Sequence, residues 1–479
     1  MTAETQPRRT KIICTLGPAS NGDDQLEALI RAGMDVARFN FSHGTHEDHQ
    51  KVYDRLRAAE GRAKKPVAVL QDLQGPKIRL GKLDGVVELE LGGTVVLSAN
   101  NDFVGTRPRM PTTYERLARD VSVGERILLA DGRVALRVQS IEVNDVTCKV
   151  EVPGVVSSSK GINLPGSRLS VPSLTEKDLA DLEFGLKMGV DYVALSFVRS
   201  SLDVDNLREH MRRLGRVVPI ISKIEKPEAV ERLVPIVEAS DGIMVARGDL
   251  GVEMPPEQVP GIQRRALRLA RRHGKITVVA TQMLMSMTKH PRPTHAEVSD
   301  VANAVFDGTD AVMLSDETAA GDFPVKAVET MAALAHAAQD APECYDAPEV
   351  VEAISGSHAG AICRAAVLTA SQLKADAIVG YTRGGLGPRL IAHWRPQCEI
   401  LGCATTDSEV RRMAFYWGVR PLKIPPPASV EGLVSAVENA TVDQGILPHG
   451  ATIIITSKMP FTEAQPTNML KIHTIERRR

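Results

Sequence analysis

Eight short runs of β-branched and other apolar residues, separated by longer segments of helical periodicity, limit most strongly what this 479-residue chain can fold into. Runs of this length that alternate with helices are typical of parallel strands joined by helical crossovers. Eight such units are enough to close a (βα)8 barrel, or TIM barrel. The sequence therefore predicts an α/β fold with barrel strands at residues 11–17, 35–43, 66–73, 191–198, 218–225, 242–249, 276–282 and 311–318.

The alternation of strand and helix breaks once, between the third and fourth predicted strands. Residues from about 77 to 170 instead contain short alternating strands and turn signals such as Asp131-Gly132. A barrel carries its chemistry at the carboxyl ends of its strands, so an insertion there is expected to form a lid. We therefore expect a small all-β lid domain at 77–170, inserted into a barrel formed by 8–76 and 171–340.

The pattern changes again after about residue 340. Residues 341–350 are typical of a linker, and an Ala-rich helix is predicted at 358–373. The three consecutive prolines at 425–427 favour a loop. Strand candidates that alternate with helices lie at 377–382, 398–405, 451–457 and 470–475. Residues 341–479 are therefore expected to form a separate α/β domain with an open sheet.

Composition and charge exclude several classes of protein. Lysine and arginine total 58, aspartate and glutamate total 59, and the formal net charge is −1. Nucleic-acid binders and membrane-surface binders usually carry a basic excess, so neither partner is expected. The chain shows no apolar signal-peptide region and no run approaching the length of a membrane span. With six scattered cysteines, the sequence predicts a cytoplasmic protein with reduced thiols.

Polar and charged residues stand at the carboxyl ends of most predicted barrel strands, where barrel enzymes place their active sites. Glu225 and Asp249 are carboxylates on neighbouring strands, which suits a hard divalent cation, although salt bridges are an alternative role. Arg38 and Lys223 point to the same end and suit a substrate with phosphate and carboxylate groups. Lys223 would alternatively be a structural partner of Glu225. Further residues at these ends are Asn40, Ser42, His43, Asp72, Gly248 and Thr281.

Seven motifs carry a resemblance to the pyruvate kinase family. They occur in the family's order from about residue 8 through 340, and the resemblance extends more loosely to the C-terminal domain. The motifs are RFNFSHG (38–44), DLQGPKIRLG (72–81), KGINLP (160–165), ISKIEKPEAV (221–230), DGIMVARGDLGVE (241–253), ATQMLMSM (280–287) and the long segment 291–324. The fold implied by the resemblance is a barrel with an inserted β-rich lid and a C-terminal α/β regulatory domain.

The resemblance also implies an activity. Pyruvate kinases are glycolytic enzymes that transfer the phosphoryl group of phosphoenolpyruvate to ADP, giving ATP and an enolate that is protonated to pyruvate. The implied cofactor is Mg²⁺ or Mn²⁺, and the implied assembly is a homotetramer. The loop at 382–387 lacks the hydroxyl-rich pattern of members that are regulated by a sugar bisphosphate, so activation by such a compound is not expected. Whether another phosphorylated effector regulates the protein is left open.

Matching residues to the family's motifs assigns expected roles. Lys223 matches the cation that stabilises the transferring phosphoryl group, and Arg38 matches a phosphate contact. Thr281 is a candidate for the relay that delivers a proton to the methylene carbon. The metal ligands match Glu225 and Asp249. The substrate carboxylate is held at positions that match Gly248, Asp249 and Thr281. The nucleotide is contacted at positions that match Asn40, His43, Arg79 and Lys160.

One departure from the family pattern concerns a monovalent cation. Many members have Glu where this chain has Lys77, and in them the Glu accompanies a bound K⁺. The groups that hold this ion match Asn40, Ser42, Asp72 and the carbonyl of Leu73. An ammonium group carries the same single charge, so we expect Lys77 to replace K⁺ and free K⁺ not to be required. A solvated lysine at the start of the lid is the alternative.

Two other functions were weighed. A metal-dependent lyase or aldolase acting on pyruvate-type compounds would also use a barrel with a Glu/Asp metal pair, but it would not need lid cations such as Arg79 and Lys160. A non-catalytic relative would be favoured by loss of Lys223, Glu225 or Asp249, and all three are present. The sequence therefore favours the phosphotransferase.

Overall fold

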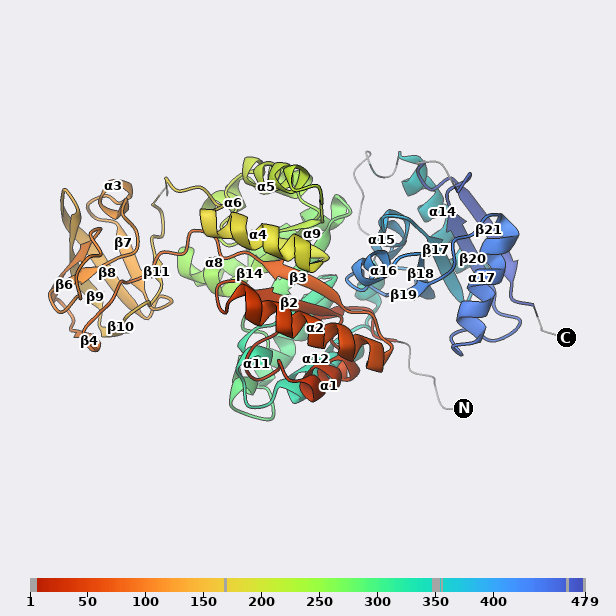
Figure 1. The fold of residues 1–479 in the computed structure, drawn as a ribbon, viewed down its shortest axis with the longest axis horizontal. Helices are drawn as coiled ribbons and strands as arrows, with labels where there is room; N and C mark the ends of the chain where they lie inside the picture. The colour runs from red at the N-terminus through yellow and green to blue at the C-terminus, as the bar shows by residue number, and fades with distance from the viewer. Residues whose placement is uncertain (1–6, 168–169, 347–353, 355, 462–464, 477–479) are drawn as a thin grey trace.

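The computed structural model of the chain describes residues 7–167, 170–346, 354, 356–461 and 465–476. Three bodies lie in a row in Figure 1: a small β-rich body at one end, a barrel in the middle and an α/β body at the other end. None of the helices in this described part of the chain combines the length and apolar character needed to cross a bilayer.

The middle body is a closed eight-stranded barrel, and every pair of neighbouring strands in it is parallel. Each of the eight predicted runs contributes one strand, so the predicted barrel is confirmed. The strands are β1 (Lys11–Thr15), β2 (Val36–Asn40), β3 (Ala68–Asp72), β12 (Tyr192–Leu195), β13 (Ile220–Ile224), β14 (Gly242–Ala246), β15 (Ile276–Ala280) and β16 (Ala311–Leu314).

Side chains alternate across the barrel wall because successive strand residues point to opposite faces. In β1, Ile12 and Cys14 belong to the apolar layer between strands and helices, whereas Ile13 belongs to a cluster that includes the barrel interior. Both faces of the strands are buried, which explains their nearly continuous apolar character. The main outer helices are α1 (Asp23–Ala32), α2 (His46–Ala63), α4 (Glu176–Met188), α5 (Ser201–Arg213), α7 (Leu233–Ala239), α9 (Val259–Arg272), α10 (His295–Phe306) and α12 (Pro324–Ala338).

Helix α4 begins with a capping box that also holds the chain where it leaves the barrel. The Thr175 hydroxyl accepts from the backbone N–H of Asp178 at 3.2 Å, and Asp178 Oδ2 accepts from the Thr175 N–H at 2.9 Å. The other oxygen of Asp178, a fully buried residue, accepts from the N–H of Gly75 at 3.0 Å. Gly75 lies on the outgoing connection to the inserted body, and Thr175 ends the returning one. The Asp178 side chain therefore joins the two connections between the barrel and the inserted body.

The inserted body is all-β except for the one-turn helix α3 (Leu117–Asp120), as the sequence predicted. It has its own apolar core, which includes Ile127, Leu136 and Val146. Its six-stranded sheet has the order β11 (Ile162–Asn163), β7 (Arg126–Leu129), β8 (Val134–Glu142), β9 (Asp145–Val152), β5 (Thr94–Ser98) and β6 (Arg109–Pro111). A second sheet pairs β4 (Val86–Leu89) with β10 (Gly154–Ser157). We call this body the lid.

The C-terminal body is an open five-stranded sheet, in agreement with the prediction. The strand order is β19 (Val419–Lys423), β18 (Glu399–Ala404), β17 (Ala377–Tyr381), β20 (Thr452–Ser457) and β21 (Met469–Thr474), with only β21 antiparallel. The helices around it are α14 (His358–Leu373), α15 (Leu386–His393), α16 (Asp407–Met413) and α17 (Val430–Val442). Of the predicted linker at 341–350, residues 347–350 lie outside the described residues.

Candidate active site

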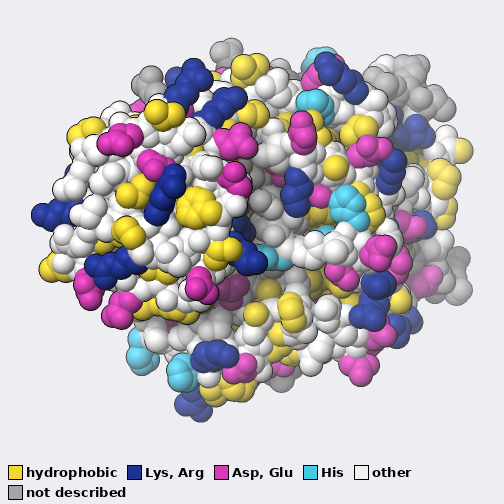
Figure 2. Space-filling view, turned by 60° about the vertical axis from the view of Figure 1, so that its left-hand side comes forward, with side chains coloured by type: hydrophobic (Ala, Val, Ile, Leu, Met, Phe, Trp, Pro, Cys, Tyr) yellow, Lys and Arg dark blue, Asp and Glu magenta, His cyan; other side chains and the backbone are white. Residues whose placement is uncertain are grey.

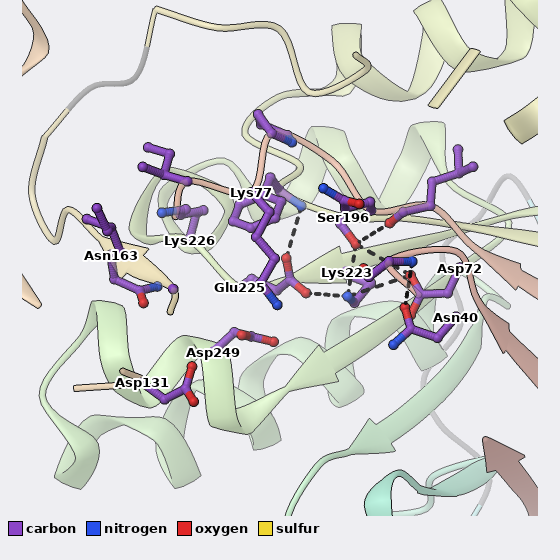
Figure 3. A pocket seen from close by; sticks show the side chains of 18 of the residues that line it. Asn40, Asp72, Lys77, Asp131, Asn163, Ser196, Lys223, Glu225, Lys226 and Asp249 are labelled. Atoms are coloured by element: carbon purple, nitrogen blue, oxygen red, sulfur yellow. Dashed lines mark hydrogen bonds and ion pairs between the residues drawn. The ribbon is translucent and has the colours of Figure 1, made fainter. Parts of the chain in front are cut away.

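A pocket lies at the carboxyl end of the barrel, where the lid meets it (Figure 3). Its lining comes from the ends of β2, β3, β12 and β13, from the start of helix α8 (Arg247–Glu253), and from the lid. It brings together nine of the residues predicted from the sequence: Arg38, Asn40, Ser42, Asp72, Leu73, Lys77, Lys223, Glu225 and Asp249. Gly248, Thr281, His43, Arg79 and Lys160 lie outside this lining.

Lys223 is buried at the centre of the pocket. Its ammonium group lies 2.6 Å from Glu225 Oε1 and 3.7 Å from Asp72 Oδ1, and it donates to Ser196 Oγ at 2.9 Å. Burial acts to lower the pKa of Lys223, but Asp72 and Glu225 outweigh it and raise the pKa above its ordinary value. Lys223 is therefore a fixed positive charge. Lys223 also forms an ion pair with Glu225, which is the structural role that the sequence left as an alternative.

Asp72 orders the second cation of the pocket. Its Oδ2 accepts from Arg38 Nε at 2.7 Å, and Arg38 Nη1 donates to Thr15 Oγ1 at 2.9 Å. Burial acts to raise the pKa of Asp72, but Lys223 and Arg38 lower it on balance. One buried carboxylate thus holds Arg38 and faces Lys223, and both cations line the same pocket.

Glu225 and Asp249 both line the pocket. Glu225 directly follows β13, and Asp249 lies in the first turn of α8, which follows the neighbouring strand β14. Glu225 Oε2 accepts from the N–H of Phe197 at 3.0 Å. Burial raises the pKa of Glu225, Asp249 adds to this rise, and Lys223 opposes it. The charge of Asp249 therefore opposes the ionisation of Glu225, and a cation bound between the two carboxylates would offset this repulsion. Within the described residues no three acidic, histidine or cysteine side chains cluster as a complete cage. This donor set fits a hard cation that keeps waters and takes substrate oxygens.

Thr281 and Gly248 form a strained contact beside the pocket. Thr281 has φ +70°, a left-handed conformation that costs a β-branched residue on the order of 1–3 kcal/mol. Its hydroxyl accepts from the N–H of Gly248 at 2.7 Å and donates to the carbonyl of Ala280 at 2.6 Å. The Gly248 N–H predicted to hold a carboxylate is therefore engaged by Thr281 in this structure.

Two of the predicted nucleotide contacts, Arg79 and Lys160, belong to the lid, whereas Asn40 ends barrel strand β2 and His43 follows it. Arg79 forms an antiparallel bridge with Gly161, and its Nη1 donates to the carbonyl of Ser159 at 2.9 Å. This bridge brings Arg79 next to Lys160, whose side chain is exposed. Burial, Lys77 and Arg79 together lower the pKa of His43. A cluster of positive charge of this kind suits the phosphates of a nucleotide.

Lys77 lines the pocket together with the groups of the expected monovalent-cation site. Partial burial and Arg79 lower the pKa of Lys77, while Asp249 and Asp131 act to raise it. The Lys77 side chain is exposed, and the attraction of Asp249 and Asp131 favours its charged form. The role of Lys77 as a replacement for K⁺ stays a prediction.

Several pocket residues were not predicted from the sequence. Ser196 follows β12 and bridges Lys223 to the carbonyl of Leu73, to which it donates at 2.8 Å. Its position at a barrel strand end was the signal that would have found it. Asp131 was predicted only as a turn residue, and Asn163 and Lys226 were not singled out individually. No local pattern marks these residues, because the folding of the lid onto the barrel brings them to the pocket.

Comparison with known proteins covers both the barrel and the C-terminal body. Family models match residues 7–328, described as pyruvate kinase, barrel domain, and residues 360–473, described as pyruvate kinase, alpha/beta domain. A pyruvate kinase from Mycobacterium intracellulare is 45% identical over 468 residues, covering 98% of each chain. One from Staphylococcus aureus is 44% identical over 98% of this chain and 80% of its own length. The crystal structure of a pyruvate kinase from Cryptosporidium parvum superposes with a TM-score of 0.91 at 35% identity, covering 98% of this chain and 96% of that chain.

Proposed function

Because the chain belongs to the pyruvate kinase family, which uses phosphoenolpyruvate and ADP and forms pyruvate, we propose that its barrel pocket carries out this phosphoryl transfer through the residues described above. The observation that carries the proposal is one pocket in which two cations, Arg38 and Lys223, face two carboxylates, Glu225 and Asp249. In-line phosphoryl transfer needs positioning and charge stabilisation rather than a protein nucleophile.

Lys223 and Arg38 act on the phosphoryl group. Arg38, oriented by Asp72, binds the phosphate of phosphoenolpyruvate. Lys223 carries a fixed charge and stabilises the group in transfer, when negative charge is spread over its oxygens. The substrate carboxylate is held near Gly248 and Thr281, and the Thr281 Oγ hydrogen is the candidate donor in the relay to the enolate carbon.

The family requires a divalent cation in general, and we assign its ligands here to Glu225 and Asp249, with Mg²⁺ or Mn²⁺ as the ion. When bound, such a cation supplies charge neutralisation for the phosphate and carboxylate oxygens. The two carboxylates line one pocket, and no group of three ligating side chains that could hold a metal by itself occurs among the described residues, which fits an ion that shares its coordination with substrate.

The nucleotide is assigned to the lid side, where its phosphates meet Arg79 and Lys160, with Asn40 and His43 on the barrel side. The boundaries that go with this assignment are a barrel of 8–76 and 171–340 and a lid of 77–170, followed by a C-terminal domain of 341–479. We also propose that the protein forms a homotetramer and acts in the cytoplasm. Regulation by a phosphorylated effector is left open. Light scattering in solution tests the assembly.

A coupled assay for ADP-dependent pyruvate formation tests the function. We expect activity with phosphoenolpyruvate, ADP and Mg²⁺, and loss of activity when a chelator removes the divalent ion. Pyruvate release that is independent of ADP would instead favour a lyase or aldolase. A failure to form pyruvate under any of these conditions would contradict the proposed catalysis.

The position of Lys77 leads to a separate prediction about K⁺. We expect the unaltered protein to be fully active without K⁺, because the Lys77 ammonium supplies a single positive charge at the pocket. The variant Lys77→Glu should lose most of its activity without K⁺ and regain it when K⁺ is added. The matched control is Lys82→Glu, which changes charge equally at an exposed lid position outside the pocket lining. Strong K⁺ activation of the unaltered protein would reject this role.

A further inference from the structure

The lid is tied to the barrel by a hydrogen bond to a buried carboxylate. Asn163 of β11 donates from Nδ2 to Glu253 Oε1 at 3.0 Å. The same oxygen accepts from Lys226 Nζ at 2.7 Å. Both Glu253 and Lys226 are buried, with 2% and 7% of their side chains exposed. A carboxylate oxygen shared by a barrel cation and a lid amide is a direct link between the two bodies.

Glu253 is not placed to stabilise its own helix. It is the last residue of α8, where a negative side chain opposes the helix dipole rather than supporting it. Its buried position instead depends on Lys226, whose ammonium also lies 5.4 Å from the centre of the Phe197 ring. The buried ion pair therefore serves contacts outside α8.

The elements joined by Glu253 carry the proposed metal ligands. Asp249 stands four residues before Glu253 in α8, and Glu225 directly precedes Lys226. A second contact supports the seating of the lid on α8: a Cβ added to Gly132 would lie 3.8 Å from Val252. Figure 3 shows Asn163 and Lys226 on the same side of the pocket. The lid thus rests on the helix that positions Asp249.

On the lid, Asn163 stands close to the cations assigned to the nucleotide. Lys160 precedes it by three residues, and the bridge between Arg79 and Gly161 lies in the same segment. Any displacement of this segment moves Arg79 and Lys160 with it. The position of Asn163 against Glu253 therefore sets how far these cations lie from the barrel side of the pocket.

We propose that Glu253 is a positioning residue that latches the lid through Asn163 in the closed position and so presents Arg79 and Lys160 to ADP. This inference rests on the proposed nucleotide role of those two cations. Glu253 lies outside the lining of the active pocket. Its buried pairing with Lys226 fixes the oxygen that accepts from the lid amide.

The test places a carboxylate on the lid side of the hydrogen bond and then exchanges the amide and the carboxylate between positions 163 and 253. In Asn163→Asp, a second carboxylate faces Glu253 and repels it, so we expect the KM for ADP to rise about tenfold or more with a much smaller change in the KM for phosphoenolpyruvate. Asn163→Ala only removes the hydrogen bond, so its effect should be smaller. The double variant Asn163→Asp, Glu253→Gln removes the repulsion and restores a hydrogen bond of reversed polarity, in which the amide at position 253 donates to the carboxylate at position 163. Its KM for ADP should return to within about threefold of the unaltered value.

A direct measurement of lid seating accompanies the kinetics. Hydrogen exchange of the backbone at 160–164 should be faster in Asn163→Asp and restored in the double variant. Asn144→Asp is the matched control, because Asn144 is an exposed lid residue in the turn between β8 and β9. It should leave both readouts unchanged.

The outcomes distinguish a failure of the nucleotide role of Arg79 and Lys160 from a failure of the latch between Glu253 and Asn163. If Arg79→Ala and Lys160→Ala leave the KM for ADP unchanged, the proposed nucleotide role fails. If those variants raise it but the variants at positions 163 and 253 neither impair nor rescue ADP binding, the latch is wrong. Equal effects of Asn163→Asp on both substrates would also overturn it, because that result indicates general damage to the pocket.

Discussion

At the scale of single residues, the pocket is organised by buried carboxylates that hold cations in place. Asp72 orients Arg38 and faces Lys223, Glu225 pairs with Lys223, and Glu253 pairs with Lys226. Each pair keeps a charge desolvated and fixed before substrate arrives. Preorganised charge of this kind requires little rearrangement during the reaction, which is the main electrostatic advantage of an enzyme site.

Removing the charge of Lys223 is expected to affect turnover more than binding. Lys223→Ala should lower kcat by about 100–1,000-fold while the KM for phosphoenolpyruvate changes less than tenfold, because the charge matters most in the transition state. Steady-state kinetics measure both values, and thermal melting verifies the fold. Lys223→Met is a second variant that keeps the volume of the buried chain. An unchanged kcat with a raised KM would contradict the role given to Lys223.

The sequence located the cations and carboxylates of the pocket because they follow barrel strands, whose ends meet by topology. It did not locate the partners that fix them. Asn163 and Glu253 are separated by 90 residues and belong to different bodies, so their contact follows from the placement of the lid. Ser196 is a small polar residue of a kind common in loops. It gains its role only because β12 and β13 are neighbours in the barrel.

At the scale of elements, local signals predicted helices and barrel strands well and failed where tertiary context decides. The capping box of α4, with Thr175 followed three residues later by Asp178, and the end of α1 at Gly33 are local signals that can be read from the sequence. Strand β19 was missed because Pro421 lies within it, and proline removes a ladder donor. The strand tolerates Pro421 because β19 is the edge of its sheet, with β18 on one side only.

The capping box of α4 gives a prediction about stability. Thr175→Ala should lower the free energy of unfolding by about 1 kcal/mol, because the Asp178 N–H loses its hydroxyl acceptor. Asp178→Ala should cost more, about 2–3 kcal/mol, since the N–H groups of Thr175 and Gly75 both lose an acceptor. Urea unfolding followed by circular dichroism measures both.

Thr294→Ala is the matched control for this prediction. Thr294 caps α10 with the same box but has no contact of this kind with the lid connections. It should behave like Thr175→Ala. A loss for Asp178→Ala no greater than that for Thr175→Ala would show that the bond to Gly75 contributes nothing.

At the scale of the whole molecule, the lid, the barrel and the C-terminal body present mixed surfaces. Basic, acidic and hydrophobic side chains are interspersed over the face shown in Figure 2, in keeping with a net charge of −1. Charge is concentrated inside instead, at the active pocket and at the base of the barrel. There Arg395, with 3% exposure, joins Asp310 of the barrel at 2.8 Å.

His393, the last residue of α15, lies beside the base of the barrel and is expected to make stability depend on pH. Burial, followed by Arg395 and Arg271, lowers the pKa of His393 from 6.5 to about 3. Below pH 6.5 the unfolded chain therefore binds a proton that the folded chain rejects, so stability is full above this pH and falls as the pH drops toward 3. Between pH 6.5 and 5 this single group should cost about 1.5 kcal/mol.

His393→Gln should lose this component of the pH dependence. Urea unfolding of both proteins at pH 7, 6 and 5 measures it as a difference in slope. His358→Gln, at an exposed histidine of the same domain, is the control and should retain the full dependence. Parallel curves for the unaltered protein and His393→Gln would contradict the burial of a neutral ring.

The bond from Asp178 to Gly75 has a consequence for how the chain folds. It joins the chain segment that leaves the barrel for the lid to the segment that returns, so that Gly75 and Asp178, about 100 residues apart in sequence, are in direct contact. For the barrel, the insertion then behaves as a single closed loop whose ends are already together. The entropy of closing such a loop grows only with the logarithm of its length. The barrel thus bears a small and nearly size-independent cost for carrying a domain there, and replacing the lid by a short turn should leave the barrel able to fold.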